Sequence, residues 1–183
     1  MTMRMCKFGQ PVGAIMQVAY VVDDLERAAA QWVKNLNVGP WMIMEHFPAE
    51  NMKYYGAPTS VDLSLAMAFA GNMSFELIVQ HCDSPSVYKD IVAKNGYGAF
   101  HHWAVTTDTF DADVDKYLKD GARVSFSGEV VPVGRKRFAY IDTMGKLPGM
   151  IEVIELSDGV EDLFAGIRGM SEGWDGSAPI RRL

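Results

Sequence analysis

Cysteine is scarce in this chain of 183 residues, and long apolar runs are missing. The two cysteines, Cys6 and Cys82, have neither the number nor the spacing of a disulfide framework or a zinc knuckle, so we expect free thiols. No apolar run approaches the roughly 20 residues of a membrane helix. The stretch 1–7 has no apolar core behind it of the length that a secretory signal needs. We therefore expect a cytoplasmic protein with no membrane partner.

An excess of basic residues is also missing, since 17 lysines and arginines face 23 aspartates and glutamates, for a formal net charge of -6. Phosphate binding needs clustered basic residues, and only 135–137 and 181–182 form such clusters. Nucleic acid is therefore not expected as a main partner. The composition is that of an ordinary globular protein, and the length suits one domain or two small modules fused into one body.

A strand pattern followed by a helix pattern occurs twice along the chain. The first strand, 14–22, leads through Asp23-Asp24 as helix cap into an amphipathic helix that ends before Gly39-Pro40. The second strand, 100–107, leads through Thr109 as cap candidate into a helix that ends at Gly121. Further expected elements are strands at 41–46, 61–70, 73–79, 123–131, 138–142 and 150–156, helices at 84–95 and 160–170, a loop at 47–60, and an irregular tail at 171–183 anchored by Trp174.

The two halves align as an internal repeat. Residues 17–23 align without a gap on 102–108, and the last strand of each half aligns 73–79 on 149–155. The sequence thus predicts an α+β fold in which two tandem βαβββ modules form a cleft or half-barrel of mixed sheet. We expect one domain, with module one at about 12–80, a linker helix at 84–95, module two at about 99–156, and a C-terminal helix and tail at 157–183.

Four polar residues interrupt apolar strands at equivalent positions of the repeat: Gln17 and Glu76 in the first half, His102 and Glu152 in the second. Pseudo-twofold packing of the modules would bring these four together in one cleft. One imidazole, two carboxylates and one amide oxygen suit a divalent ion such as Zn, Mn, Co, Ni or Fe better than a thiolate-loving ion. Taken singly, each has a structural interpretation: a solvated edge carboxylate for Glu152, and a half-buried amide for Gln17.

The two adjacent histidines in the strand 100–107 have two possible interpretations. Side chains alternate along a strand, so His101 and His102 are expected on opposite faces. The alignment with Gln17 places His102 in the cleft and leaves His101 on the helix-packed side. Alternatively, both are hydrogen-bonded structural histidines.

With these motifs the sequence resembles the vicinal oxygen chelate superfamily, which includes glyoxalase I, methylmalonyl-CoA epimerase, extradiol dioxygenases and bleomycin-resistance proteins. The resemblance covers about 14–156, and it depends on the opening strand with Asp24-Leu25-Glu26, on the histidine strand and on the final strand around Glu152. It implies the glyoxalase fold, and, by analogy only, a homodimer.

The resemblance implies that the family's four metal positions fall on Gln17, Glu76, His102 and Glu152. This set resembles that of glyoxalase I, whereas an extradiol dioxygenase is expected to have a second histidine at Gln17. The resemblance further implies one divalent ion and a substrate carbonyl whose neighbouring carbon loses a proton to Glu152, the first choice for the base, or to Glu76. His102 is then a fixed ligand.

An epimerase of this family resembles a two-base enzyme with a glutamate in the third strand. Here the nearest position is Ser64, with Asp62 on the same strand face. Exchange of a proton between opposite faces of a carbon thus lacks its obvious second base, although Asp62 is a substitute candidate.

Substrate contacts are expected from three further residues beside Ser64 and Asp62. Met44 belongs to a set of methionines that either line a pocket or fill the core. Arg135 and Arg137 either hold a carboxylate, a glutathione or a coenzyme A phosphate, or belong to a solvated turn. The first hypothesis is thus a metal-dependent isomerase, lyase or epimerase that acts on a small carbonyl or thioester compound. The alternatives are a metal-free small-molecule binding protein of the resistance type and a ring-cleaving dioxygenase.

Overall fold

The computed structural model describes residues 4–183, so the first three residues of the N-terminal stretch lie outside the described part. In this part the chain forms strands β1 (Ile15–Val21), β2 (Trp41–Met44), β3 (Ala49–Tyr54), β4 (Ala57–Pro58), β5 (Leu63–Ala70), β6 (Met73–Gln80), β7 (Ala99–Thr107), β8 (Arg123–Val130), β9 (Lys136–Asp142), β10 (Met150–Glu155) and β11 (Ile180–Arg182). The helices are α1 (Leu25–Leu36), α2 (Val87–Asn95), α3 (Phe110–Lys119) and α4 (Asp158–Ser171), with a 3-10 turn η1 (Val131–Val133).

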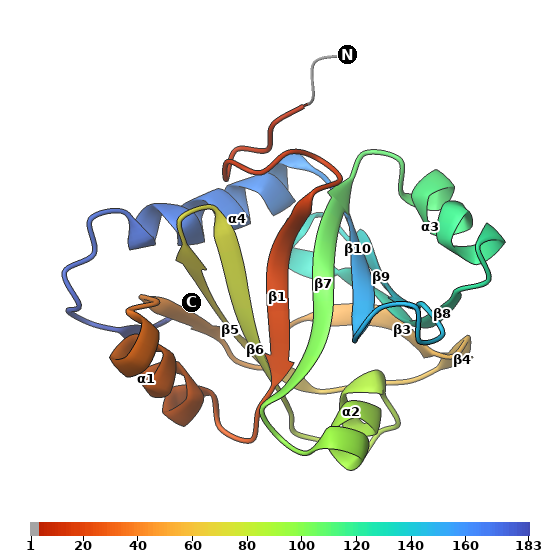
Figure 1. Cartoon of the computed structure of the whole chain (residues 1–183), viewed down its shortest axis with the longest axis horizontal. Coiled ribbons are helices and arrows are strands. Elements are labelled where there is room, and N and C mark those ends of the chain that lie inside the picture. Colours follow the sequence, from red (N-terminus) through yellow and green to blue (C-terminus); the bar gives the residue numbers. More distant parts are fainter. Residues whose placement is uncertain (1–3) are drawn as a thin grey trace.

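All strands of the described chain belong to one curved, unclosed mixed sheet with the order β11-β2-β5-β6-β1-β7-β10-β9-β8-β3-β4. The order is symmetric about the centre, where β1 and β7 run antiparallel side by side (Figure 1). Strand β1 pairs in parallel with β6, as β7 does with β10, so each half repeats the same arrangement. The predicted α+β fold of two similar halves is therefore confirmed.

The pairing of β1 with β7 follows the repeat seen in the sequence. Gln17 lies opposite Ala104, and Ala19 lies opposite His102. A twofold axis between the strands exchanges these two pairs, so Gln17 and His102 occupy equivalent places.

Each of the two central strands also contains a β-bulge, which the sequence pattern does not reveal. Ala19 and the residue after it in β1 pair with residues of β7 that are two positions apart, so His101 is an extra residue in β7. In the same way, Met16 is an extra residue in β1. A bulge interrupts the alternation of side chains. As a result, Nδ1 of His101 lies 2.8 Å from Nδ1 of His102. The expectation that the two histidines point to opposite faces is wrong for this reason.

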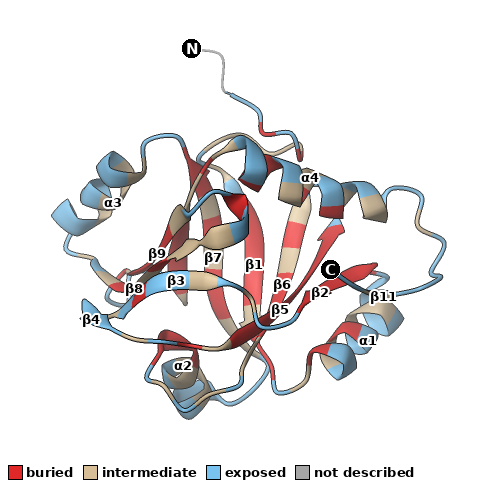
Figure 2. Ribbon diagram, turned by 180° about the vertical axis from the view of Figure 1, so that it is seen from behind, coloured by how far each residue is buried: buried red, intermediate tan, exposed pale blue. Residues whose placement is uncertain are grey.

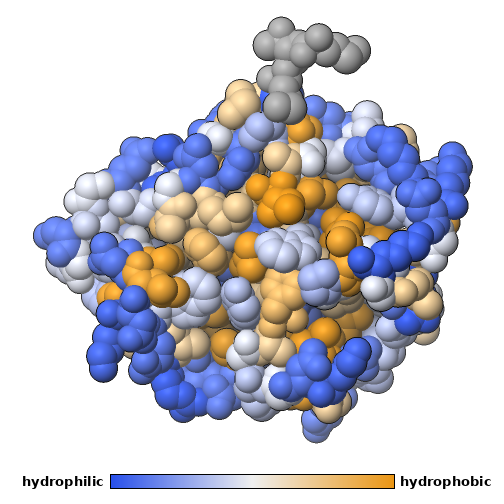
Figure 3. All heavy atoms as spheres, in the orientation of Figure 1, coloured by the Kyte–Doolittle hydropathy of each residue, from blue (hydrophilic) through white to orange (hydrophobic). Residues whose placement is uncertain are grey.

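The sheet has a convex face covered by α1 and α3 and a concave face covered mainly by α4 and α2. Apolar residues of β5 and β6 pack on α1, and those of β9 and β10 pack on α3. The larger core lies on the concave side and includes Phe164 of α4 and Tyr88 of α2. Figure 2 shows α4 and β3 in front of this buried side. On the opposite side, hydrophobic residues gather over the central strands and hydrophilic ones surround them (Figure 3).

The helix boundaries follow capping residues that the sequence displays. The backbone N–H of Arg27 donates to the carboxylate of Asp24 at 2.8 Å, and Ser86 and Ser157 accept equivalent bonds at the starts of α2 and α4. Thr109, the cap candidate for α3, makes no side-chain bond to the helix backbone. No helix of the described residues is long and apolar enough to cross a membrane.

Two segments differ from their expected conformation. The expected loop 47–60 contains β3 and β4, and β3 pairs with β8 of the other half of the sheet. The expected irregular tail contains β11, which pairs in parallel with β2. Both are edge elements with polar, largely exposed sequences, so they lack the apolar alternation that identifies a strand. Trp174 does pack as an anchor, since its ring lies where a side chain on Gly39 would point.

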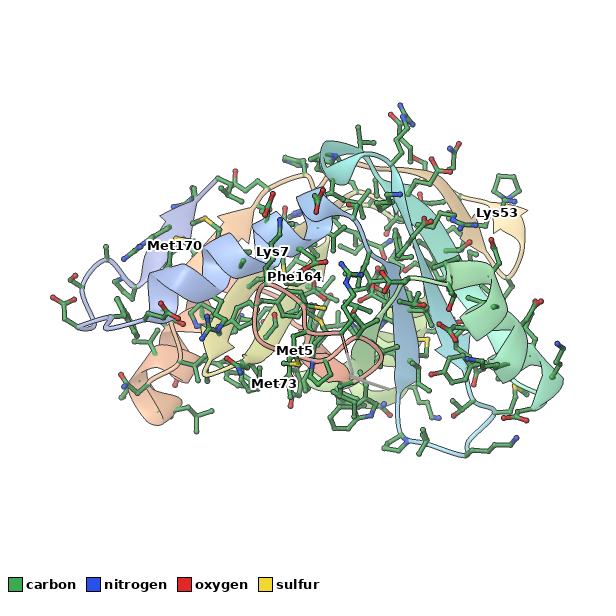
Figure 4. The ribbon with its side chains drawn as sticks, turned by 90° about the horizontal axis from the view of Figure 1, so that it is seen from above. Met5, Lys7, Lys53, Met73, Phe164 and Met170 are labelled. Carbon is green, nitrogen blue, oxygen red and sulfur yellow. The ribbon has the colours of Figure 1, made fainter. Side chains whose placement is uncertain are left out.

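The N-terminal segment contacts α4 and holds it over the concave face. The backbone N–H of Lys7 donates to Glu161 at 2.9 Å, and the Lys7 ammonium pairs with Asp162 at 2.7 Å. Phe8 packs on Phe164 with ring centroids 5.4 Å apart. Figure 4 shows Lys7 and Phe164 close together at α4. The helix is thus held against the sheet by both charged and apolar contacts.

Candidate active site

A cavity lies on the concave side of the sheet beneath α4, with a volume of about 80 Å³. Its wall is mostly apolar, because strands direct alternate side chains inward and α4 contributes its own apolar face. Apolar wall residues include Leu63, Leu65 and Met67 from β5, Phe138 from β9, and Leu163 and Phe164 from α4.

The polar part of the cavity is formed by the four residues that the repeat singles out. They belong to the four central strands of the sheet, and their exposed fractions are 1% for Gln17, 6% for Glu76, 0% for His102 and 8% for Glu152. Gln17, Glu76 and Glu152 line the cavity, and His102 lies behind the two carboxylates. Its Nε2 is 3.2 Å from Oε2 of Glu152 and 3.6 Å from Oε2 of Glu76.

The strand register explains why these residues meet. Glu76, Ala19 and His102 form one row across β6, β1 and β7. Gln17, Ala104 and Glu152 form the neighbouring row across β1, β7 and β10. The two alanines are fully buried between the polar residues and are small enough to leave room for all four side chains.

The electrostatics of this cluster are unbalanced. Burial and the nearby charge of Glu152 hold the pKa of Glu76 well above its usual range, and a hydrogen bond from Gln17 opposes this rise. No lysine or arginine of the described chain lies within 4.0 Å of either carboxylate, whose only basic neighbour is His102. Among residues 4–183, the buried Oε1 of Gln17 and Nε2 of His102 also have no hydrogen-bond partner.

These observations bear on whether the residues fit a metal ion. No group of three or more His, Cys, Asp or Glu side chains in the described part is arranged to hold one as the side chains stand. The chemistry of the cluster nevertheless fits, because a cation would balance two buried carboxylates. It would also take up the free donor atoms of Gln17 and His102. We therefore regard the donor set as compatible with a divalent ion.

The bulge places a second layer of residues behind this cluster. His101 is fully buried, stacks on Tyr88 with ring centroids 4.7 Å apart, and contacts Tyr140. Burial, with a smaller contribution from His102, lowers the pKa of His101, so its ring is neutral. The hydroxyl of Tyr88 donates to that of Tyr140 at 3.0 Å, and burial raises the pKa of both phenols. Sequence alternation alone could not place His101 in this layer, because its position depends on the bulge.

Asp62 and Ser64, expected at the substrate, are not brought to the cavity. Leu63 and Leu65 take the inward positions of this part of the chain, so their neighbours turn outward. Ser64 lines a separate shallow hollow, where its Oγ lies 2.7 Å from Nε2 of His81. Asp62 pairs there with His46 at 2.8 Å.

The remaining expected substrate residues also have other contacts. Met44 is buried in the concave core beside the cavity. Arg135 pairs with Glu50, and Arg137 pairs with Glu155 and Asp111 on the side of α3, although Arg137 also borders the cavity. Three polar lining residues, Tyr88, Tyr140 and Lys136, were not expected at the site from the sequence. Strand β9 pairs with the strand that contains Glu152, and every second residue of a strand faces the same side. Counting every second residue along β9 could therefore have identified Tyr140 and Lys136.

Comparison with known families gives one match. Residues 16–140 match the family model described as Glyoxalase/Bleomycin resistance protein/Dioxygenase superfamily, which is more than half of the chain. The matched range contains Gln17, Glu76 and His102, and Glu152 lies beyond it. No curated protein sequence matches the chain.

Solved structures share the fold at low identity. A hypothetical protein from Bacillus halodurans C-125 is 15% identical, with a TM-score of 0.56 over 80% of this chain and 96% of that one. Methylmalonyl-CoA epimerase from Mycobacterium tuberculosis is 16% identical, with a TM-score of 0.53 over 81% and 90%. A methylmalonyl-CoA epimerase in complex with methylmalonyl-CoA and NH4+ is 18% identical, with a TM-score of 0.51 over 80% and 96%.

Proposed function

The chain belongs to the Glyoxalase/Bleomycin resistance protein/Dioxygenase superfamily, and we propose that it is a divalent-metal-dependent enzyme of the isomerase, lyase or epimerase type. Its substrate is a small carbonyl or thioester compound, on which it moves a proton at the carbon beside the carbonyl. The observation that supports this proposal is the convergence of Gln17, Glu76 and Glu152 in the wall of a mostly apolar cavity, with His102 directly behind the two carboxylates.

The proposed metal ligands are these same four residues, with Zn, Ni, Co, Mn or Fe as the ion. A bound divalent ion supplies Lewis-acid polarisation of the carbonyl and stabilises the negative charge that deprotonation creates. The protein contributes a set of buried donors, two of which have no other partner in the described chain. Because the surrounding wall is apolar, water is largely excluded and charge interactions at the site are strengthened.

Proton transfer is assigned to the two carboxylates. Glu152 is the proposed base, because it lines the cavity from the strand next to His102 and can face a ligand bound there. Glu76 lines the same wall and is the alternative base. His102 remains fixed, with its ring held by His101.

The placement of Asp62 and Ser64 favours a proton shift on one face of the substrate over a two-base epimerisation. An epimerase must supply a base on each face of the carbon. Here Ser64, at the position of the missing second base, lines a separate hollow, and Asp62, the substitute candidate, pairs with His46 outside the cavity. The structural neighbours named as epimerases share only the fold at this level of identity. We therefore place isomerase or lyase chemistry first within the proposal.

The metal-binding part of the proposal is tested by elemental analysis of the full chain after incubation with each candidate ion and removal of the excess. We expect about one ion per chain, and less than one tenth of this in His102→Ala and in Glu76→Ala/Glu152→Ala. His81→Ala and Glu155→Ala are the matched controls, since both residues lie outside the cavity. Equal metal content in the site variants and the controls would contradict the assignment.

The catalytic part is tested by following exchange of the substrate proton with D2O by NMR. Two probes with different carrier groups are used. One is methylmalonyl-CoA, and the other is the hemithioacetal that methylglyoxal forms with glutathione. We expect metal-dependent exchange with at least one probe, and a loss of about 100-fold or more in Glu152→Gln, since a positioned general base contributes roughly 10²–10⁴-fold. Exchange that is unaffected by Glu152→Gln and by Glu76→Gln would exclude both carboxylates as the base.

Small-molecule binding without catalysis is the second candidate, and the largely apolar lining of the cavity favours it. An apolar pocket can hold a ligand by burial of surface alone. A protein that binds a ligand in this cavity with metal absent, and that shows no proton exchange when metal is supplied, would establish this second function in place of the first.

A further inference from the structure

Lys136 is the first residue of β9, and its position gives it the same orientation as two residues of the cavity wall. Phe138 and Tyr140 lie two and four residues further along the strand, and all three line the cavity. Arg137, the residue between Lys136 and Phe138, borders the cavity as well, but its guanidinium is engaged on the side of α3, where it pairs with Asp111 and Glu155. This alternation is the ordinary period of a strand.

Lys136 also differs from the two adjacent arginines in its ion pairs. Arg135 pairs with Glu50, and Arg137 pairs with two carboxylates. Within residues 4–183, no carboxylate lies within 4.0 Å of the Lys136 ammonium, although the side chain is half-buried. Lys136 is thus the one cation of the cavity lining that has no acidic partner in the described chain.

The cavity separates this cation from the polar cluster. Tyr140 lies opposite Glu152 in the sheet, and Lys136 lies four residues before Tyr140. At about 3.3 Å per residue, the two levels are about 13 Å apart along the strand. Between them the wall is apolar, with Phe138 on β9 and Ile154 on β10. A ligand that spans the cavity would meet a polar cluster at one end, an apolar middle, and one positive charge at the other end.

We propose that Lys136 binds the carboxylate of an elongated, otherwise apolar substrate and thereby determines which compounds the cavity accepts. A single ammonium suits a monoanion, whereas phosphate groups are usually held by several cations or by arginine forks. The assignment of the carboxylate to the Lys136 end depends on the proposed function, since the carbonyl then occupies the end at Glu152. The anion preference itself does not require metal or catalysis.

The test compares octanoate with octan-1-ol, which have the same chain length and differ in the anionic group. Isothermal titration with the full chain is expected to show octanoate binding at least tenfold more tightly than the alcohol. Lys136→Met, which keeps a long apolar side chain, should weaken octanoate binding about tenfold to a hundredfold and change the Kd of octan-1-ol less than twofold. Lys136→Arg should retain most of the preference, and the exposed Lys119→Met is the control with the same change of charge.

Three outcomes would overturn the inference. In the first, Lys136→Met leaves octanoate affinity within twofold of the wild type. In the second, it weakens acid and alcohol equally. In the third, octanoate loses affinity in His102→Ala and keeps it in Lys136→Met. This last result would place the carboxylate at the polar cluster and leave the proposed metal site intact. Conversely, a protein that binds no metal but shows the Lys136-dependent preference would contradict the proposed function alone.

Discussion

At the scale of single residues, the adjacent histidines show how a local irregularity changes the chemistry available to a site. A regular strand would place His101 and His102 on opposite faces. Because of the bulge in β7, their Nδ1 atoms instead lie 2.8 Å apart, and Nε2 of His102 faces the two carboxylates. His101 is thereby a positioning residue, because its contact with Nδ1 constrains the orientation of the His102 ring.

Removing this contact should weaken metal binding. We expect His101→Leu to raise the metal Kd about 10- to 100-fold, since residues that orient a metal-bound histidine typically contribute this much. The measurement is competition with a chromophoric chelator. Tyr88→Phe is the control, because it preserves the ring that stacks on His101 and removes only a hydroxyl. An unchanged Kd in His101→Leu would show that His102 is oriented by other contacts.

The cationic residues at the start of β9 show what residue-level sequence reasoning can decide. A basic turn at 135–137 is evident in the sequence, and the expectation selected its two arginines for their geometry with anions. The structure pairs both arginines with carboxylates and directs Lys136 inward. The inward direction of Lys136 could be predicted from the strand period counted from Phe138. The ion pairs of the two arginines could not, because their partners are distant in the chain.

At the scale of elements, helix starts follow local chemistry, and the cap of α1 is readable from the sequence, whereas Thr109, the cap expected for α3, makes no capping bond. Asp24 before α1, Ser86 before α2 and Ser157 before α4 each satisfy a free backbone N–H of the first turn. The strands β3 and β11 behave differently, because a strand of mostly polar residues near the edge of the sheet is defined by its partner rather than by its own pattern.

The cap of α1 provides a test at this scale. We expect Asp24→Ala to lower the free energy of unfolding by about 1 kcal/mol, the usual contribution of an N-cap side chain. Asp23→Ala removes the same charge one residue earlier, and its ion pair with Arg27 is exposed, so a change within about 0.5 kcal/mol is expected. Urea denaturation followed by circular dichroism measures both variants. Equal losses in the two variants would indicate a general charge effect in place of capping.

At the scale of the whole molecule, the symmetric sheet concentrates acidic groups at its centre. Each half contributes one carboxylate, and the antiparallel pairing of β1 and β7 brings the two halves together. The folded chain therefore buries Glu76 close to Glu152 with no lysine or arginine of residues 4–183 beside them. Such an arrangement destabilises the folded state when both groups are ionised, unless a cation is bound.

The pH dependence of stability follows from the pKa of Glu76, which is raised in the folded state. The folded chain then holds a proton that the unfolded chain releases near the ordinary range of glutamate. The metal-free protein should therefore lose stability as the pH rises from this range through the folded pKa. We expect Glu76→Gln to reduce this loss, and denaturant titrations between pH 4 and about pH 8 would measure it. A parallel pH dependence in Glu76→Gln and the wild type would contradict this account.

The repeated order of strands and helices can be predicted from the amino-acid sequence, because apolar periodicity and capping residues act over a few positions. The sequence also identifies Gln17, Glu76, His102 and Glu152 as equivalent polar exceptions within apolar strands. The inward position of His101, the separation of Ser64 and Asp62 from the cavity, and the ion pairs that leave Lys136 without a carboxylate within 4.0 Å in the described chain become visible only in the folded molecule. These features depend on which strands pair and in which register, and that is settled by contacts between residues far apart in the chain.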